Sequence, residues 1–167
     1  MTDSLLPRLV AGIDAVLPEA ASLRRAIHAD PHLGGDEMDT RDSITQAIDW
    51  LDWLPVAETG AYARFGPAGP AVGLRAELDA LPITEATGVE WASQRRGIMH
   101  ACGHDVHMAA LWAVVTAARD LDLPVAMVPL LQPREEENPP GATDVVASGF
   151  LDDAEVAAMV GVHVQPQ

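Results

Sequence analysis

The sequence has no lysine, a single cysteine and few aromatic residues. All ten basic residues are arginine, and aromatic residues make up 4% of the chain. A lone cysteine excludes an internal disulfide. Hydrophobic residues nevertheless make up 49% of the chain. A sizeable core can therefore form, and it must be built from alanine, valine and leucine.

The excess of acidic residues restricts the partners that the chain can have. The formal net charge at pH 7 is −15, which would repel phosphate backbones and anionic lipid surfaces, so we expect no nucleic-acid or membrane partner. The N-terminus lacks a basic region followed by an apolar run, and no stretch reaches the roughly 18 apolar residues of a membrane span. We therefore expect a soluble cytoplasmic protein.

Hydrophobic periodicity predicts helices alternating with strands. Helices are expected over residues 4–29, with a break near Pro18, and over 36–54 and 104–121, with a short one from about Thr143. Strands are expected over residues 56–65, 71–76, 125–131 and 156–164, the last two buried, although Pro129 weakens the third. Residues 80–103 are mostly irregular. This alternation is typical of a layered α/β domain.

The densest cluster of reactive groups lies in residues 100–107. It contains one thiol, three imidazoles and a carboxylate: His100, Cys102, His104, Asp105 and His107. Cys102 and His104 can bind one metal centre because Gly103 permits a turn between them. A thiolate with an imidazole suits Zn, Co, Ni or Mn better than Mg or Ca. A lone cysteine is more often an inert buried thiol, but the surrounding histidines favour a metal site.

Three adjacent glutamates, Glu135, Glu136 and Glu137, follow the apolar stretch 125–131 directly. Such a run is often an exposed acidic loop. In open α/β sheets, however, ligands gather at the carboxyl ends of strands. One glutamate can bind a metal while its neighbour takes a proton from water, so we favour a functional pair of Glu135 and Glu136.

His163 lies in an otherwise apolar strand, where a satisfied core histidine is the commoner arrangement. Beside the other candidate groups, we favour a metal ligand, with its second nitrogen held by an acceptor. Glu77 and Asp79 end the stretch that begins at residue 71, and strand alternation places both on one face. They could orient a ligand histidine or bind metal, or they could belong to an exposed strand end.

Four segments carry these groups: Arg75-Ala-Glu-Leu-Asp-Ala-Leu-Pro82, Gly97-Ile-Met-His-Ala-Cys-Gly-His-Asp-Val-His107, Gln132-Pro-Arg-Glu-Glu136 and Gly161-Val-His-Val-Gln-Pro166. Together with Leu23-Arg-Arg-Ala-Ile-His-Ala-Asp-Pro31, they resemble the metal-dependent amidohydrolases that include hippurate hydrolases, N-acyl-amino-acid hydrolases and auxin-conjugate hydrolases. The resemblance covers about residues 20–166. It implies a helix–sheet–helix catalytic domain like that of zinc aminopeptidases, incomplete in this chain.

The resemblance also implies a role for each candidate residue. Two divalent transition metal ions (Zn, Mn, Ni or Co) would be held by Cys102, His104, Glu136 and His163. Glu135 would be the general base and Asp79 the acidic residue that supports the metal site. The remaining motif residues, His100, Asp105 and His107, would have hydrogen-bonding or packing roles. The implied substrate is an N-acyl amino acid or small peptide, whose amide bond is hydrolysed.

Length separates the chain from the proteins that it resembles, which are more than twice as long. The resemblance implies that residues 1–167 are the N-terminal part of the dinuclear-metal catalytic domain, with the lid or dimerisation domain and the C-terminal part absent. A complementing chain or a homo-oligomer would then cover the remaining apolar faces.

Two other functions fit the same residues. A truncated chain could bind metal or a partner without catalysis. Alternatively, Cys102 could act as a nucleophile with a nearby histidine as base, although this leaves the paired glutamates without a role.

Overall fold

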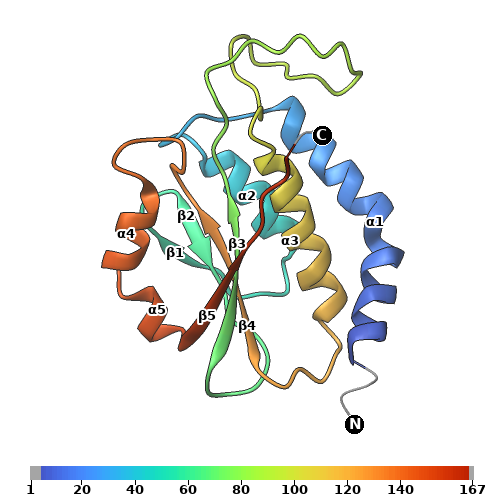
Figure 1. Cartoon of the computed structure of the whole chain (residues 1–167), viewed down its shortest axis with the longest axis vertical. Helices are drawn as coiled ribbons and strands as arrows, with labels where there is room; N and C mark the ends of the chain where they lie inside the picture. Colours follow the sequence, from blue (N-terminus) through green and yellow to red (C-terminus); the bar gives the residue numbers. More distant parts are fainter. Residues whose placement is uncertain (1–4, 166–167) are drawn as a thin grey trace.

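Five strands form one mixed sheet in the computed structural model, which describes residues 5–165 (Figure 1). The strands are β1 (Leu54–Val56), β2 (Gly60–Tyr62), β3 (Ala71–Glu77), β4 (Ala126–Gln132) and β5 (Val156–Gly161). Their order in the sheet is β1-β2-β4-β3-β5. β3 runs parallel to both β4 and β5, whereas β2 is antiparallel to β1 and β4. The carboxyl ends of β3, β4 and β5 therefore lie side by side at the same end of the sheet.

Helices cover both faces of this sheet, as the layered α/β prediction requires (Figure 1). They are α1 (Leu5–Ala29), α2 (Met38–Ala47), α3 (His104–Ala118), α4 (Gly141–Ala147) and α5 (Phe150–Asp153). Alternate residues of β4 explain the two layers. Leu131 packs with Met108 of α3 in one core, whereas Leu130 packs with Phe150 of α5 in the other. α1 packs against α3.

Two helix predictions were wrong in detail. α1 continues through Pro18 without a break. Pro18 and Asp14 both lie on the exposed side of the helix, so the Asp14 carbonyl that loses its helical partner can be solvated. α2 ends at Ala47 rather than near residue 54. The indole N–H groups of Trp112 and Trp53 donate to the carbonyls of Ala47 and Ile48, and so satisfy acceptors that the helix end leaves free.

The strand expected over residues 56–65 is interrupted. Residues 57–59 turn the chain between β1 and β2, and Phe65 pairs with Met127 only through an isolated bridge. Pro129 explains why β2 ends at Tyr62 instead of continuing to Phe65. The Ala63 N–H donates to the Pro129 carbonyl, but proline has no N–H to return the second bond of this antiparallel pair. On the other side of β4, Pro129 remains in register with β3.

The last strand was expected to be buried, and that prediction was wrong. β5 is an edge strand of the sheet. Its first residue, Val156, is half-buried, and the other five are exposed. No segment within residues 5–165 pairs with its outer side. No helix within the described residues combines the length and apolarity needed to cross a membrane.

Replacing Leu131 with alanine should destabilise the fold. Leu131 is fully buried at the centre of the α3-facing core, and removing a buried leucine side chain costs about 2–5 kcal/mol. Chemical denaturation of Leu131→Ala measures this loss. Leu6→Ala is the matched control, because Leu6 is 67% exposed. Equal stability losses in the two variants would contradict the placement of the core.

Candidate metal centre

The parallel alignment of β3, β4 and β5 brings four distant segments together at the carboxyl ends of these strands. Asp79 follows β3, the glutamate pair follows β4, and His163 follows β5. α3 begins at the same end of the sheet with His104, directly after Cys102 and Gly103. All of the site residues expected from the sequence therefore meet here: Asp79, Cys102, His104, Glu135, Glu136 and His163.

Donor atoms of three different chemical types lie close together in this cluster. Ligand atoms of Cys102, His104 and Glu136 all lie within 4.8 Å of one another. His163 also lies close by, with Nε2 3.9 Å from the Cys102 Sγ. Glu135 lies beside them, with Oε2 3.8 Å from the His104 Nε2. A thiol, imidazoles and carboxylates form a donor set that fits a divalent transition metal.

Gly103 allows the thiol and the imidazole to share this space. Its φ of +84° lies in the left-handed region, which glycine adopts without steric cost. A Cβ atom at this position would also collide with the side chain of Val164, next to His163. The glycine therefore serves both the turn and the close approach of the segment that follows β5.

Asp79 fixes the orientation of two of these groups. Its backbone carbonyl accepts a hydrogen bond of 2.8 Å from the His104 Nδ1, so Nδ1 carries the proton and Nε2 faces the cluster as an acceptor. The Asp79 Oδ2 accepts a 2.8 Å bond from the Glu136 N–H. Burial disfavours both charges, but the bonds between Asp79, His104 and the glutamate backbone outweigh it. They lower the pKa of Asp79 and raise the pKa of His104.

Glu37 holds the loop that presents the glutamate pair, a role that no local pattern in the sequence indicates. This fully buried carboxylate accepts three 2.8 Å hydrogen bonds, from the N–H groups of Gly35 and Arg134 and from the Thr59 hydroxyl. Arg134 has a φ of +51°, which is rare for a residue with a side chain. Its guanidinium pairs with Asp144. Glu37 therefore stabilises an unfavourable backbone conformation directly before Glu135.

Negative charge accumulates around Cys102. Burial, a hydrogen bond to Glu136 and the charges of Glu136, Glu135 and Glu77 raise the pKa of the Cys102 thiol to about 12. A thiol in this state is a poor nucleophile near neutral pH, which counts against the cysteine-hydrolase alternative. A divalent cation would relieve the repulsion among these groups.

Of the other motif residues, Asp105 links two helices, and the ring of His100 has no hydrogen-bond partner among the described residues. Asp105 is buried and accepts hydrogen bonds from the Arg24 Nε at 2.5 Å and from the His28 Nδ1 at 2.8 Å. These bonds join α3 to the segment of α1 that carries the early motif. His100 is also buried, and burial lowers its pKa to about 4.

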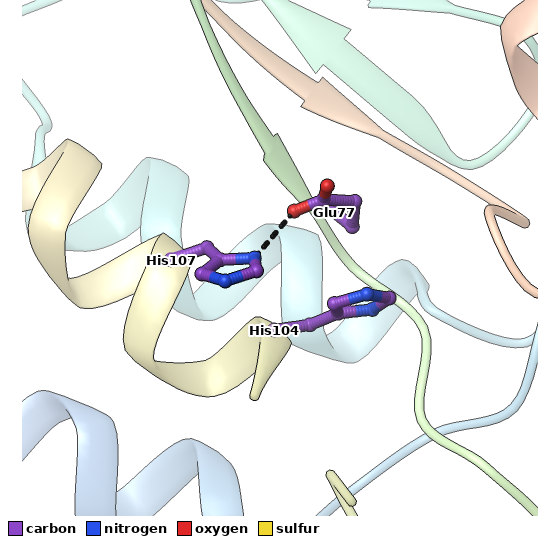
Figure 2. Close-up of side chains that lie close together, drawn as sticks. All are labelled: Glu77, His104 and His107. Atoms are coloured by element: carbon purple, nitrogen blue, oxygen red, sulfur yellow. Dashed lines mark hydrogen bonds and ion pairs between the residues drawn. The ribbon is translucent and has the colours of Figure 1, made fainter. Parts of the chain in front are cut away.

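A second group, formed by Glu77, His104 and His107, lies beside the first and is buried (Figure 2). From the sequence, Glu77 could orient a ligand histidine, bind metal or belong to an exposed strand end. In the structure, Glu77 contacts His107, with Oε2 2.8 Å from Nδ1, and no hydrogen bond joins it to His104 among the described residues.

A cluster of thiol, imidazole and carboxylate at the carboxyl ends of the parallel strands of a helix-covered sheet is typical of one class of protein: α/β proteins that bind a divalent metal. Within that class, the chain belongs to peptidase family M20/M25/M40, whose family model matches residues 73–167. The family resemblance inferred from the motifs is thus confirmed.

Individual relatives agree with this assignment. The chain is 39% identical over 150 residues to an N-acetyl-L-cysteine deacetylase of Bacillus subtilis, covering 86% of this chain and 36% of the relative. It is 40% identical over 151 residues to an IAA-amino acid hydrolase ILR1-like protein of Arabidopsis thaliana, covering 86% and 32%. The chain thus spans about a third of the length of these curated relatives.

A solved structure shows the same fold. The YxeP protein of Bacillus subtilis, described as a dinuclear metal-binding peptidase of the M20 family, matches with a TM-score of 0.83 and 34% identity. The match covers 92% of this chain and 44% of that structure.

Replacing Glu37 with alanine should destabilise the protein and release the glutamate loop. Three hydrogen-bond donors would lose their acceptor, and buried unsatisfied groups cost about 1–3 kcal/mol each, so we expect the unfolding free energy to fall by at least about 3 kcal/mol. Denaturant titration measures it. The control is Asp36→Ala, because Asp36 is exposed. A loss no larger than that of the control would contradict the role of Glu37.

Proposed function

We propose that this chain is part of a dinuclear metal-dependent hydrolase that cleaves the amide bonds of N-acyl amino acids or small peptides. The observation that carries the proposal is the convergence of Cys102, His104 and Glu136 within 4.8 Å, with Glu135 beside them. The names of the two curated relatives describe reactions at an amide bond to an amino acid. Residues 1–167 would form the N-terminal part of the catalytic domain.

Two divalent transition metal ions, Zn, Mn, Ni or Co, would be held by Cys102, His104, Glu136 and His163. The description of YxeP as dinuclear supports the number of ions. When bound, such ions polarise the substrate carbonyl and make a water molecule more acidic. The His104 Nε2 is available to bind a metal ion, because the Asp79 carbonyl holds the proton on Nδ1.

Glu135 would act as the general base. It would accept a proton from the attacking water and deliver it to the nitrogen of the leaving amine. Its side chain is 37% exposed, so water can reach it, and its Oε1 lies 3.9 Å from the Arg75 NH2. Asp79 would act as a positioning residue, since its Oδ2 holds the Glu136 backbone and its carbonyl holds His104.

Metal loading followed by metal removal tests the proposal. We expect close to two equivalents of Zn²⁺, Mn²⁺ or Co²⁺ per chain, hydrolysis of N-acetyl amino acids by the loaded protein, and loss of this activity with a chelator. The absence of stoichiometric metal would overturn the proposal. Metal binding without turnover would favour the non-catalytic alternative. Inactivation by thiol alkylation but not by chelators would favour a cysteine nucleophile.

Glu135→Gln should lower kcat by about 10²- to 10⁴-fold, the usual contribution of a general base, because an amide cannot accept the proton from water. Metal stoichiometry should be unchanged. Glu137→Gln is the matched control, because it removes one carboxylate from the exposed end of the same loop. A similar loss of kcat in both variants, measured with an N-acetyl amino acid, would show that the effect is electrostatic and not specific to the base.

A further inference from the structure

Glu77 and His107 form a buried pair next to the candidate metal centre (Figure 2). His107 lies on α3, one turn after His104, and points toward Glu77 at the end of β3. The ligand atoms of Glu77, His104 and His107 lie within 4.8 Å of one another, which by itself would suit a further metal site. The hydrogen bonds of His107 indicate a different role.

Both ring nitrogens of His107 already have partners. The Val164 N–H donates to Nε2 at 3.1 Å, so Nε2 must be an unprotonated acceptor. Nδ1 therefore carries the proton and donates it to the Glu77 Oε2 at 2.8 Å. A metal bound at Nε2 would displace the Val164 N–H, and a metal bound at Nδ1 would displace the bond to Glu77.

The carboxylate of Glu77 is equally committed. Its Oε1 pairs with the Arg75 NH1 at 2.6 Å while Oε2 accepts from His107. Arg75 continues the chain of contacts, because its Nε donates to the Gln132 Oε1 at 2.5 Å. Glu77 is thus compensated by an arginine and fixes one tautomer of His107.

The far end of this chain of contacts lies beside a candidate metal ligand. The pairing of β5 with β3 ends at Gly161, so His163 lies beyond the last paired residue. Val164 follows it directly, with its backbone bonded to His107 and its side chain against Gly103. The ring centroids of His107 and His163 are 5.2 Å apart in an edge-to-face arrangement. The hydrogen bond from the Val164 N–H to His107 therefore anchors the backbone directly after His163.

We propose that His107, held by Glu77, is a positioning residue that places His163 in the metal centre by binding the Val164 backbone. This inference rests on the proposed function, because it assumes that His163 is a metal ligand. Partners of this kind typically change metal affinity by 10- to 100-fold. Two variants separate the contributions: His107→Phe removes both hydrogen bonds, whereas Val164→Pro removes the Val164 N–H donor and leaves the bond between His107 and Glu77 in place. The proline also restricts the backbone at positions 163 and 164.

The first measurement uses the metal-free protein. A long-range ¹H–¹⁵N spectrum should show His107 protonated on Nδ1 alone, and hydrogen exchange should show a protected Val164 amide that loses protection in His107→Phe. His107→Gln should retain part of this protection, because its amide both donates and accepts. The opposite tautomer, or a Val164 amide that exchanges equally fast in wild type and His107→Phe, would overturn the proposal.

The second measurement is Co²⁺ binding by calorimetry and absorption spectroscopy. His107→Phe and Val164→Pro should weaken one Co²⁺ equivalent by about 10- to 100-fold without changing the stoichiometry, and His107→Gln should restore most of the affinity. In a His163→Ala background, His107→Phe should cause no further loss, because it acts through His163. Met108→Leu, a buried neighbour on α3 without a hydrogen bond, is the matched control.

The outcomes distinguish this inference from the proposed function. If wild-type protein binds no Co²⁺, the proposed function fails. The metal-free measurement still decides whether His107 holds the Val164 backbone. If Co²⁺ binds but His107→Phe removes a whole equivalent and Val164→Pro has no effect, His107 is itself a ligand and the positioning role is wrong. Additive losses of affinity in the His163→Ala background would also overturn it.

Discussion

The parallel alignment of β3 with β4 and β5 is the constraint on which the candidate metal centre depends. Each strand delivers its chemically active residues only after its last paired residue, so the register of the ladders decides which side chains can meet. Arg75 pairs with Leu130 of β4 and Gly161 of β5, which places Asp79, the glutamate loop and His163 at comparable heights. A shift in either register would separate the donor atoms, even though every residue remained in the chain.

Buried carboxylates then supply the precision that strand pairing cannot. Glu37, Glu77 and Asp79 each use their oxygens to hold another group: the loop before Glu135, the ring of His107 and the backbone of Glu136. Burying a charge is unfavourable unless it is compensated by hydrogen bonds or an opposite charge. Glu37 and Glu77 meet this condition with both oxygens, through backbone N–H groups, side-chain donors or Arg75. Asp79 meets it through Oδ2, whereas its buried Oδ1 has no hydrogen-bond partner among the described residues.

The sequence predicted the layered α/β class, α3 and the six clustered residues, because these depend on strong local signals. Cys102-Gly-His104 is a compact motif, and α3 is apolar on almost every side. The failures concern tertiary context. The exposure of β5 depends on which strands flank it, and the end of α2 depends on indole groups from Trp53 and Trp112. Glu37 is separated from Arg134 by 97 positions, and no local pattern in one sequence links such a pair.

The free edge of β5 has a consequence for how the described chain behaves in concentrated solution. An unpaired strand edge is a template for pairing with another chain, and β5 combines this edge with exposed Met159 and Val160. The net charge of −15 opposes such encounters through mutual repulsion. Because that repulsion is screened over about 8 Å at physiological ionic strength, we expect contacts between copies through this strand to become easier as the salt concentration rises.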